Sequence, residues 1–274
     1  MIKFSKLQGA GNDFVIIEPK NKTIHELSAL AKKMCDRHFG IGADGLMAVV
    51  SSNKADIEMI YFNSDGSRGE MCGNGIRCFS QYVVQKGIIK SDTFTVDTLA
   101  GIKEITMNRN RKNAVNVHMG TWSFDPQNIP VKTNKDKYFL EEITVGNENF
   151  QISCVLMGVP HAVIFVNNIS DINIVKLGPL IENMDLFPNK INVNFCKIIN
   201  KSTMMVDTWE RGAGKTLACG TGACASVVVA HTLDLVDPAV KVSVLGGNLN
   251  ILLQDQNVFM EGEAELICDG EFYE

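Results

Sequence analysis

The sequence predicts an α+β fold made of two pseudo-symmetric domains, each with a mainly antiparallel, curved sheet wrapped around a central helix. A Cys-Gly-x-Gly motif occurs twice, at Cys72–Gly75 and at Cys219–Gly222, and the two cysteines are 147 positions apart. Each motif precedes a stretch with helical character, and most other elements have the pattern of short strands separated by turns. A repeat of this length indicates two domains, because solenoid repeats run to about 20–50 residues.

In the first half, the apolar run over 14–18 predicts a buried strand, and the periodicity of 24–37 predicts an amphipathic helix. Thr23 and Glu26 form a capping-box pattern at the start of that helix. A second helix is expected over 73–86, and Gly87 is well suited to end it. Further strands are expected at 57–62, 94–98, 102–108 and 114–119, with a turn at 63–67.

In the second half, a helix over 174–184 should be broken at Gly178-Pro179, whereas a helix over 223–233 is apolar nearly all round and should be buried. Strands are expected at 152–156, 162–166, 192–199, 203–209, 240–244, 249–253 and 258–261. Two prolines make 122–130 the best candidate for a linker. The predicted domains are therefore residues 1–118, joined by a C-terminal strand over 264–274, and residues 119–263.

The composition excludes several classes of protein. With 274 residues and a formal net charge of −5, the chain has neither the basic footprint of a nucleic-acid-binding protein nor an apolar run of about 20 residues that could span a membrane. The N-terminus lacks the pattern of a signal peptide, so a cytoplasmic protein is expected. None of the eight cysteines forms a C-x₂-C pair and the five histidines do not cluster, so no metal site is expected. Six cysteines are expected to be packing residues: Cys35, Cys78, Cys154, Cys196, Cys224 and Cys268.

The two remaining cysteines, Cys72 and Cys219, stand where a helix is expected to begin. A helix N-terminus offers unpaired N–H groups and a partial positive charge, which lower the pKa of a thiol and favour the reactive thiolate. The following glycines allow a ligand to approach the backbone closely. If both helix ends bound one carboxylate, one thiolate could remove the neighbouring α-proton while the other thiol delivered a proton to the opposite face. This arrangement would racemise or epimerise an amino acid without a cofactor.

Polar residues near the motifs are candidates for binding a zwitterion. Glu210-Arg211 lies between an apolar strand and a glycine turn, where it could be a solvated surface pair or could hold the ammonium and carboxylate groups of a ligand. The side chains of Asn12, Asn63, Asn74 and Asn192 are neutral hydrogen-bonding groups, although each could also be an ordinary turn residue. The segment 212–216 resembles the end of a phosphate loop, but Trp209 occupies the position of its first glycine.

Five segments together resemble the diaminopimelate epimerase family. They are Gly9-x-Gly-Asn-Asp-Phe14, Phe62-Asn-x-Asp-Gly-Ser67, Glu70-Met-Cys-Gly-Asn-Gly-Ile-Arg-Cys78, Trp209-Glu-Arg-Gly-Ala-Gly214 and Thr216-Leu-Ala-Cys-Gly-Thr-Gly222. The likeness follows the chain in order over nearly its whole length. It implies two pseudo-symmetric domains with the site between them, and interconversion of LL- and meso-diaminopimelate in lysine and peptidoglycan biosynthesis. It also implies a homodimer and a reaction that needs no pyridoxal phosphate or metal, while the charge and composition predict no nucleic-acid or membrane partner.

The resemblance implies a role for each matching residue. Cys72 and Cys219 would be the acid–base pair, and Gly73, Asn74, Gly220 and Thr221 would bind the reacting carboxylate. Asn12 would face the reacting amino group. Asn63, Asn192, Glu210 and Arg211 would hold the distal, non-reacting amino-acid centre.

Alternatives remain open at this stage. Val159 stands where the family usually has an asparagine that helps to bind the distal end, so a cofactor-independent racemase of another amino acid, such as histidine, is the second interpretation. A thiol redox or sensor protein could use the same two cysteines as a regulatory disulfide. A passive amino-acid-binding module would bind its ligand without turning it over.

Overall fold

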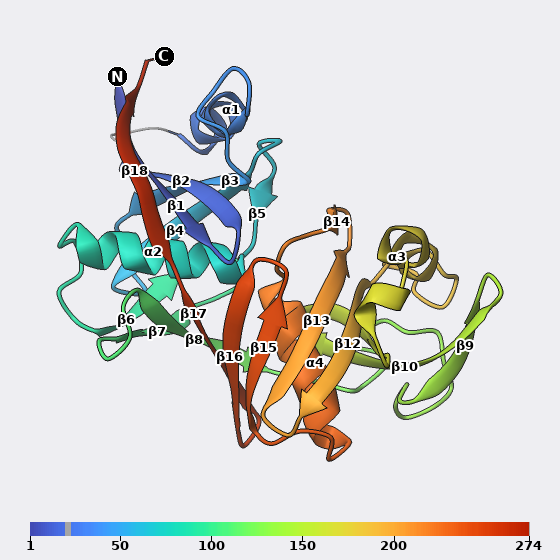
Figure 1. The fold of residues 1–274 in the computed structure, drawn as a ribbon. Helices are drawn as coiled ribbons and strands as arrows, with labels where there is room; N and C mark the ends of the chain where they lie inside the picture. Colours follow the sequence, from blue (N-terminus) through green and yellow to red (C-terminus); the bar gives the residue numbers. More distant parts are fainter. Residues whose placement is uncertain (20–22, 274) are drawn as a thin grey trace. The chain divides into compact units, whose positions relative to one another are not determined.

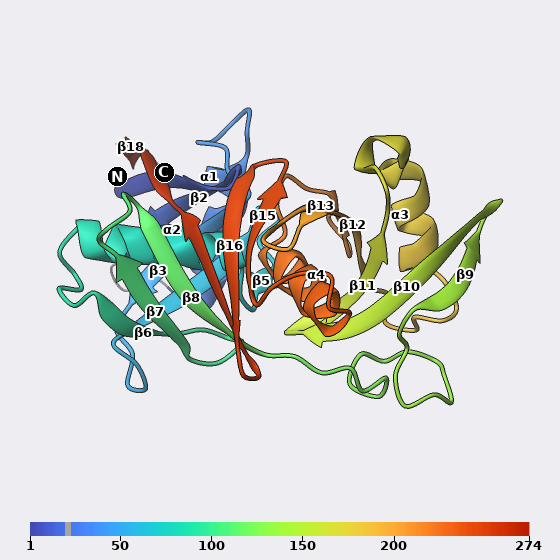
Figure 2. The same ribbon diagram turned by 60° about the horizontal axis from the view of Figure 1, so that its bottom comes forward.

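The computed structural model describes residues 1–19 and 23–273, and these residues form two compact units (Figures 1 and 2). Unit 1 comprises Met1–His118 together with Glu261–Glu274, and unit 2 comprises Met119–Met260. Residues 20–22 and Glu274 fall within the predicted bounds of the first domain but lie outside the described residues.

Unit 1 begins with a hairpin of β1 (Ile2–Gly9) and β2 (Asn12–Ile17). Ala10 and Gly11, the two residues between these strands, have φ angles of 51° and 85°. Two consecutive residues with positive φ match the right-handed twist of a two-residue hairpin. This turn sets the register that places Asn12 opposite Gly9, at the end of the hairpin.

The rest of unit 1 wraps a sheet around helix α2 (Gly73–Gln85), whose residues from Gly73 to Ser80 are all buried. Helix α1 (Ile24–Cys35) connects β2 to the parallel strand β3. The other strands of this part of the chain are β3 (Gly45–Val50), β4 (Ile57–Asn63), β5 (Arg68–Gly69), β6 (Thr93–Asp97), β7 (Lys103–Asn108), β8 (Ala114–Thr121) and β18 (Glu265–Phe272). Strand β18 runs antiparallel beside β1, with Ile2 opposite Phe272 (Figure 1).

Unit 2 repeats this plan around helix α4 (Gly220–Thr232), which is buried from Ala223 to Ala230. Helix α3 (Ile174–Glu182) connects β11 to the parallel strand β12, and a 3₁₀ turn, η1 (Ile169–Asp171), precedes it. The strands are β9 (Glu141–Val145), β10 (Glu148–Met157), β11 (Val159–Phe165), β12 (Asn192–Asn200), β13 (Thr203–Glu210), β14 (Gly214–Lys215), β15 (Ala239–Val244), β16 (Gly247–Gln254) and β17 (Asn257–Glu263). Figure 2 shows β15 and β16 beside α4.

The two units have the same connectivity. In each, a helix joins two parallel strands, β2 to β3 in unit 1 and β11 to β12 in unit 2. The strand that follows, β4 or β13, runs antiparallel to the second of these two strands. The central helix comes next, and after it a strand that pairs parallel with β4 or β13, namely β6 in unit 1 and β15 in unit 2. The predicted α+β fold with two pseudo-symmetric repeats is thus confirmed, and each cysteine motif occupies the same place in its unit.

Several local expectations are confirmed and two are wrong. Thr23 and Glu26 form the reciprocal hydrogen bonds of a capping box, and Gly87, with a φ of 72°, follows the end of α2. Helix α3 is not broken, because Pro179 lies inside a continuous helix. Cys268 is not a packing residue, because β18 has both faces largely exposed and Cys268 is exposed on it.

Candidate active site

Cys72 is the N-cap residue of α2. Its backbone is extended (φ −128°, ψ 122°), and its Sγ accepts a hydrogen bond of 3.4 Å from the N–H of Gly75. The side chain therefore satisfies one of the N–H groups that the first turn of a helix leaves unpaired. The sulfur thus sits at the positive end of the helix, next to the backbone of Gly73 and Asn74.

A chain of hydrogen bonds ties Asn12 to this helix start. The amide of Asn74 donates to Oδ1 of Asn12, and the amide of Asn12 donates to Oδ2 of Asp44 at 2.9 Å. Arg77, one turn into α2 and fully buried, donates to Oδ1 of Asn74 at 3.0 Å and to the Gly73 carbonyl at 2.9 Å. The structure thus brings together Asn12, Gly73 and Asn74, and fixes them relative to Cys72.

Asp13 anchors the strand that carries Asn12. Although burial opposes its charge, hydrogen bonds and ion pairs with Arg37 and Lys6 hold the pKa of its carboxyl below the usual range. Arg37 contacts both oxygens of Asp13, at 3.1 and 2.8 Å, and also reaches Asp44 at 2.7 Å. Asp44 was not anticipated as a site residue, and its only sequence signal was a carboxylate within a glycine-rich turn.

Asn63 lies at the end of β4, and its side chain forms hydrogen bonds within the turn that follows this strand. Its Oδ1 accepts from the Tyr61 hydroxyl at 2.7 Å, and its amide donates to the Ser67 hydroxyl at 2.9 Å. Asp65 accepts in turn from the backbone and the hydroxyl of Ser67. The sequence-predicted turn over 63–67 is therefore a closed hydrogen-bonded loop that precedes the cysteine motif.

Cys219 repeats the arrangement at the start of α4. It is the N-cap, its Sγ accepts from the N–H of Gly222 at 3.4 Å, and Sγ lies 3.5 Å from the hydroxyl of Thr221. Unlike Cys72, which is partly accessible, Cys219 is only 5 % exposed. The first turn of α4, which contains Gly220 and Thr221, is thus built around this sulfur.

Glu210 lies beside Cys219. Burial raises the pKa of the Glu210 carboxyl, which is partly offset by hydrogen bonds from Thr216, at 2.6 Å, and from Cys219. Burial, followed by the charge of Glu210, raises the pKa of the Cys219 thiol well above its ordinary value. The expectation that the helix N-terminus lowers the pKa of this thiol is therefore wrong, because loss of solvation outweighs the helix end.

Asn192 and Arg211 form a second contact in unit 2. The N–H of Arg211 donates to Oδ1 of Asn192 at 2.9 Å, and the amide of Asn192 donates to the Pro160 carbonyl at 2.8 Å. The guanidinium of Arg211, an exposed residue of this turn, donates to the Asn189 carbonyl at 3.0 Å. The buried side chain of Asn192 thus fixes where the Arg211 turn leaves strand β13.

Glu182, at the end of α3, supports the same turn and was not anticipated from sequence. It is buried, it accepts from the indole N–H of Trp209 at 2.7 Å, and it accepts from the N–H of Gly212 at 3.3 Å. Trp209 in turn packs on Gly178, where an added Cβ would lie 2.4 Å from the indole. The Gly178-Pro179 pair therefore creates the close approach that Trp209 needs.

His161 is a further buried polar residue that sequence reasoning did not single out. It is fully buried on β11, and burial, with a smaller contribution from the charge of Arg211, lowers its pKa to about 3. Its Cα is paired in register with Asn192 on β12. The signal for it was its place in the Gly158–His161 segment, the weak echo of Gly9–Asn12.

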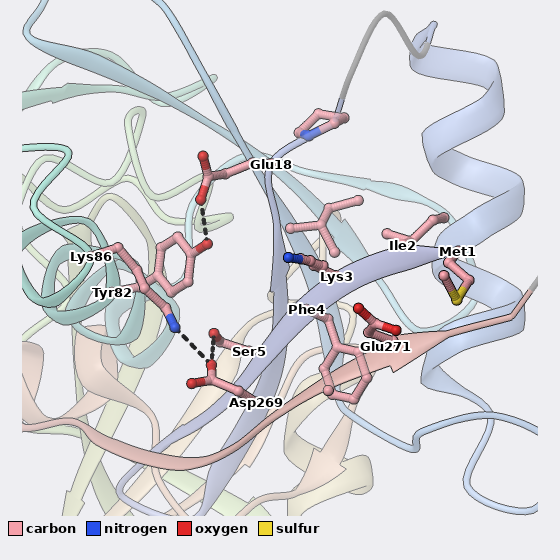
Figure 3. Close-up of a pocket in the computed structure, with 13 residues that line it drawn as sticks. Met1, Ile2, Lys3, Phe4, Ser5, Glu18, Tyr82, Lys86, Asp269 and Glu271 are labelled. Atoms are coloured by element: carbon pink, nitrogen blue, oxygen red, sulfur yellow. Dashed lines mark hydrogen bonds and ion pairs between the residues drawn. The ribbon is translucent and has the colours of Figure 1, made fainter.

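A cavity of about 890 Å³ lies at the opposite end of α2 from Cys72 (Figure 3). Four of its polar side chains are paired with one another, since Tyr82 donates to Glu18 at 2.7 Å and Lys86 donates to Asp269 at 2.9 Å. Neither cysteine nor any other sequence-predicted site residue lines it. This cavity is therefore not the candidate active site.

The described residues offer neither a cluster of metal ligands nor a membrane-spanning helix. In residues 1–19 and 23–273, no group of three or more His, Cys, Asp and Glu side chains is arranged to hold a metal ion. The helices in the same ranges include none that is long and apolar enough to cross a membrane.

The first testable prediction compares two helix glycines. A Cβ at Gly222 would lie 2.3 Å from Oδ1 of Asn194, which hydrogen bonds hold in place, whereas the one severe contact of a Cβ at Gly75 would be with the terminal methyl of the flexible Met47 side chain. We expect Gly222→Ala to lower the free energy of unfolding by about 1–3 kcal/mol, the usual cost of overpacking. Gly75→Ala is the matched control and should cost clearly less in urea denaturation. Equal losses of unfolding free energy in the two variants would contradict a rigid contact between Gly222 and Asn194.

The fold places the chain in a structural class that includes a solved amino-acid epimerase. A solved structure of a hydroxyproline epimerase from Agrobacterium vitis superposes with a TM-score of 0.72 at 14 % identity, covering 98 % of this chain and 90 % of that one. At such low identity the likeness shows the fold alone. It matches the two-unit architecture derived above.

Sequence comparison identifies the family. The family model described as diaminopimelate epimerase matches residues 4–124 and 153–267. Diaminopimelate epimerases of Clostridium perfringens and Alkaliphilus metalliredigens are 49 % and 46 % identical over 99 % of this chain, and 99 % and 97 % of their own lengths are covered. The chain therefore belongs to the diaminopimelate epimerase family, whose members are isomerases.

Proposed function

We propose that this protein epimerises LL-diaminopimelate to meso-diaminopimelate with Cys72 and Cys219 as the two proton-transfer groups. The observation that carries the proposal is that each unit begins its central helix with a cysteine N-cap whose sulfur accepts an N–H of the first turn. Membership of the diaminopimelate epimerase family supports the substrate. The proposal requires the two units to present these sulfurs to opposite faces of one carbon.

The reaction needs no net change in electrons. One thiolate removes the α-proton, so that an S–H bond forms and the C–H electron pair remains on the α-carbon and spreads into the carboxylate. The thiol on the other side then gives its proton to the opposite face of that carbon. After one turnover the two cysteines have exchanged protonation states, and no pyridoxal phosphate or metal ion takes part.

The raised pKa of Cys219 makes it the proton donor in the resting protein. In the reverse direction Cys219 must accept, and Glu210 is placed to take its proton first, because the two side chains share a hydrogen bond. The carboxylate of Glu210 then becomes a carboxylic acid, and Sγ of Cys219 becomes the thiolate. Cys72, the donor in this direction, takes up one proton from solvent, and Glu210 returns one proton to solvent after turnover. Glu210 thus serves the reacting centre in addition to the distal role that the resemblance implies.

The helix ends stabilise the charge that develops on the reacting carboxylate. We assign its binding to Gly73, Asn74, Gly220 and Thr221, which lie in the first turns of α2 and α4. One well-placed hydrogen-bond donor contributes about 3–4 kcal/mol to such a transition state, so two helix ends supply a substantial share of the barrier reduction. Asn12, held by Asn74 and Asp44, faces the reacting amino group.

The distal amino-acid centre is assigned to Asn63, Asn192, Glu210 and Arg211. Arg211 is the group best suited to a second carboxylate, because a guanidinium can bind both oxygens and its turn is fixed by Asn192 and Glu182. Val159 begins β11 opposite Met157 and offers no side-chain hydrogen bond to this end. That one observation favours the second candidate function, racemisation of another amino acid such as histidine.

The proposed biological setting is lysine and peptidoglycan biosynthesis in the cytoplasm, with the protein acting as a homodimer. The small-molecule amino-acid substrate follows from the family. The proposal involves no nucleic acid and no membrane partner.

The proposed function predicts exchange of the α-proton with solvent. Incubation with LL-diaminopimelate in deuterium oxide and reductant, without added cofactor, should introduce deuterium at the α-carbon and form the meso isomer, as seen by NMR and chiral chromatography. Exchange on histidine or another amino acid, but not on diaminopimelate, would select the second candidate. Ligand binding without exchange on any substrate would leave only the passive binding module.

A further inference from the structure

Asn194 is a buried amide at the centre of unit 2. It lies on β12 with no exposed surface. Its side chain contacts three polar groups: the Ala162 carbonyl at 3.0 Å, Nδ1 of His161 at 3.2 Å and the Thr208 hydroxyl at 3.0 Å. Gly222 packs against its Oδ1 so closely that an added Cβ would lie 2.3 Å from that oxygen. Through Gly222 it touches the turn that Cys219 caps. It therefore links His161 to the helix start that carries a proposed catalytic thiol.

The surroundings determine which way the amide points. The Ala162 carbonyl can only accept a hydrogen bond, so the NH₂ group of Asn194 must face it. Oδ1 then faces Thr208, whose hydroxyl donates to it. The second hydrogen of the NH₂ group is directed at Nδ1 of His161. The opposite orientation would place two carbonyl oxygens in contact, which disfavours it.

The amide orientation in turn determines the state of His161. Because Nδ1 accepts a hydrogen bond, it carries no proton, and in a neutral ring the proton is on Nε2. Complete burial and the nearby charge of Arg211 disfavour the imidazolium. Nε2 is buried and has no hydrogen-bond partner among the described residues, so its N–H can donate a hydrogen bond to a ligand.

We propose that Asn194 is a positioning residue that holds His161 in the neutral Nε2–H tautomer, so that His161 serves the site as a hydrogen-bond donor and not as a base. The role of the site rests on the proposed function, whereas the tautomer does not. A ring with its proton on Nε2 and an amide on Nδ1 has no free nitrogen to accept an α-proton. Proton abstraction is thereby left to the two thiols.

The direct test is the tautomer of His161 in the full chain. Long-range ¹H–¹⁵N NMR of protein labelled in histidine distinguishes protonated from unprotonated ring nitrogens, and the His161 signals are assigned from their loss in His161→Gln. We expect protonated Nε2 and bare Nδ1 in the unaltered protein. A proton on Nδ1, or an imidazolium near neutral pH, would overturn the proposal without any further variant.

Two variants at position 194 test the cause. Asn194→Leu removes the donated hydrogen bond and should leave a mixture of tautomers, while Asn194→Asp offers an acceptor and should draw the proton to Nδ1. Thr208→Val, the matched control, removes the partner of Oδ1 but leaves the donation to His161, so the Nε2–H tautomer should persist. Retention of a pure Nε2–H tautomer in both Asn194 variants would also overturn the proposal.

A kinetic readout separates positioning from stability. Variants are compared at a temperature where circular dichroism shows each of them folded. Deuterium exchange into diaminopimelate should fall about 10- to 100-fold in Asn194→Asp, as expected for a displaced active-site group, and much less in Thr208→Val. Equal losses would show that Asn194 has only a structural role. If the unaltered protein itself exchanges no proton, the proposed function fails, while the NMR result still decides the tautomer.

Discussion

Replacing either Cys72 or Cys219 by alanine is expected to reduce epimerisation by about 10⁴-fold, because each substitution removes the proton-transfer group on one face of the α-carbon. Turnover is measured as formation of the meso isomer from LL-diaminopimelate. Both sulfurs cap a helix, so each variant should also lose some stability, about 1 kcal/mol from the lost cap. A loss of that size leaves most of the protein folded at 25 °C.

Cys268→Ala provides the matched control for these two variants. Cys268 is exposed on β18, far along the chain from both motifs, and its removal should leave epimerisation unchanged. Serine at position 72 or 219 keeps the cap but offers a far weaker acid, so it should be nearly as inactive as alanine. Near-parental turnover in any single variant at 72 or 219 would contradict the two-thiol mechanism.

Glu210→Gln is expected to have the second largest effect, a loss in kcat of about 10²–10⁴-fold, which is the usual contribution of a positioned acid–base group. Glutamine keeps the volume and can still accept a hydrogen bond from Thr216, but it cannot take the proton of Cys219. Steady-state kinetics in both directions measures the effect. The loss should be greater in the direction in which Cys219 accepts the α-proton.

The dependence on pH provides a second measurement for Glu210. Because burial raises the pKa of its carboxyl, the active ionised form appears at a higher pH than for an exposed glutamate, and kcat should rise with pH through that raised pKa. In Glu210→Gln this rise should disappear. Thr216→Val is the control, since it removes a hydrogen bond that favours the ionised form and should move the rise to still higher pH. An unchanged profile in Glu210→Gln would show that Glu210 does not act on the proton of Cys219.

Local signals were enough to predict most elements of the fold. Thr23 and Glu26 mark the start of α1 because capping is a property of a few neighbouring residues, and the Cys-Gly motifs mark the starts of α2 and α4 in the same way. Strand β3 (Gly45–Val50) was not anticipated, because a short apolar run without alternation is compatible with several structures. Pro179 was expected to break α3, but the helix continues through it, with Trp209 close against Gly178.

The candidate site was predictable in its residues but not in its contacts. The two cysteines and the asparagines stand in motifs, whereas the bond between Asn12 and Asn74 joins residues 62 positions apart and depends on the tertiary fold. The same is true of Glu182 beneath the Arg211 turn and of Asn194 beside His161. The raised pKa of Cys219 could not be foreseen, because desolvation depends on burial that only the folded chain establishes.

The pairing of β1 with β18 has a consequence for synthesis of the protein on the ribosome. Strand β1 finds one of its two partners only after about 250 further residues have been made, where Ile2 lies opposite Phe272 and Gln8 opposite Glu265. The second unit is therefore fully translated before the first can be completed, the reverse of the usual N-to-C order of co-translational folding. A nascent chain that stalls before β18 has been made therefore leaves one edge of β1 unpaired.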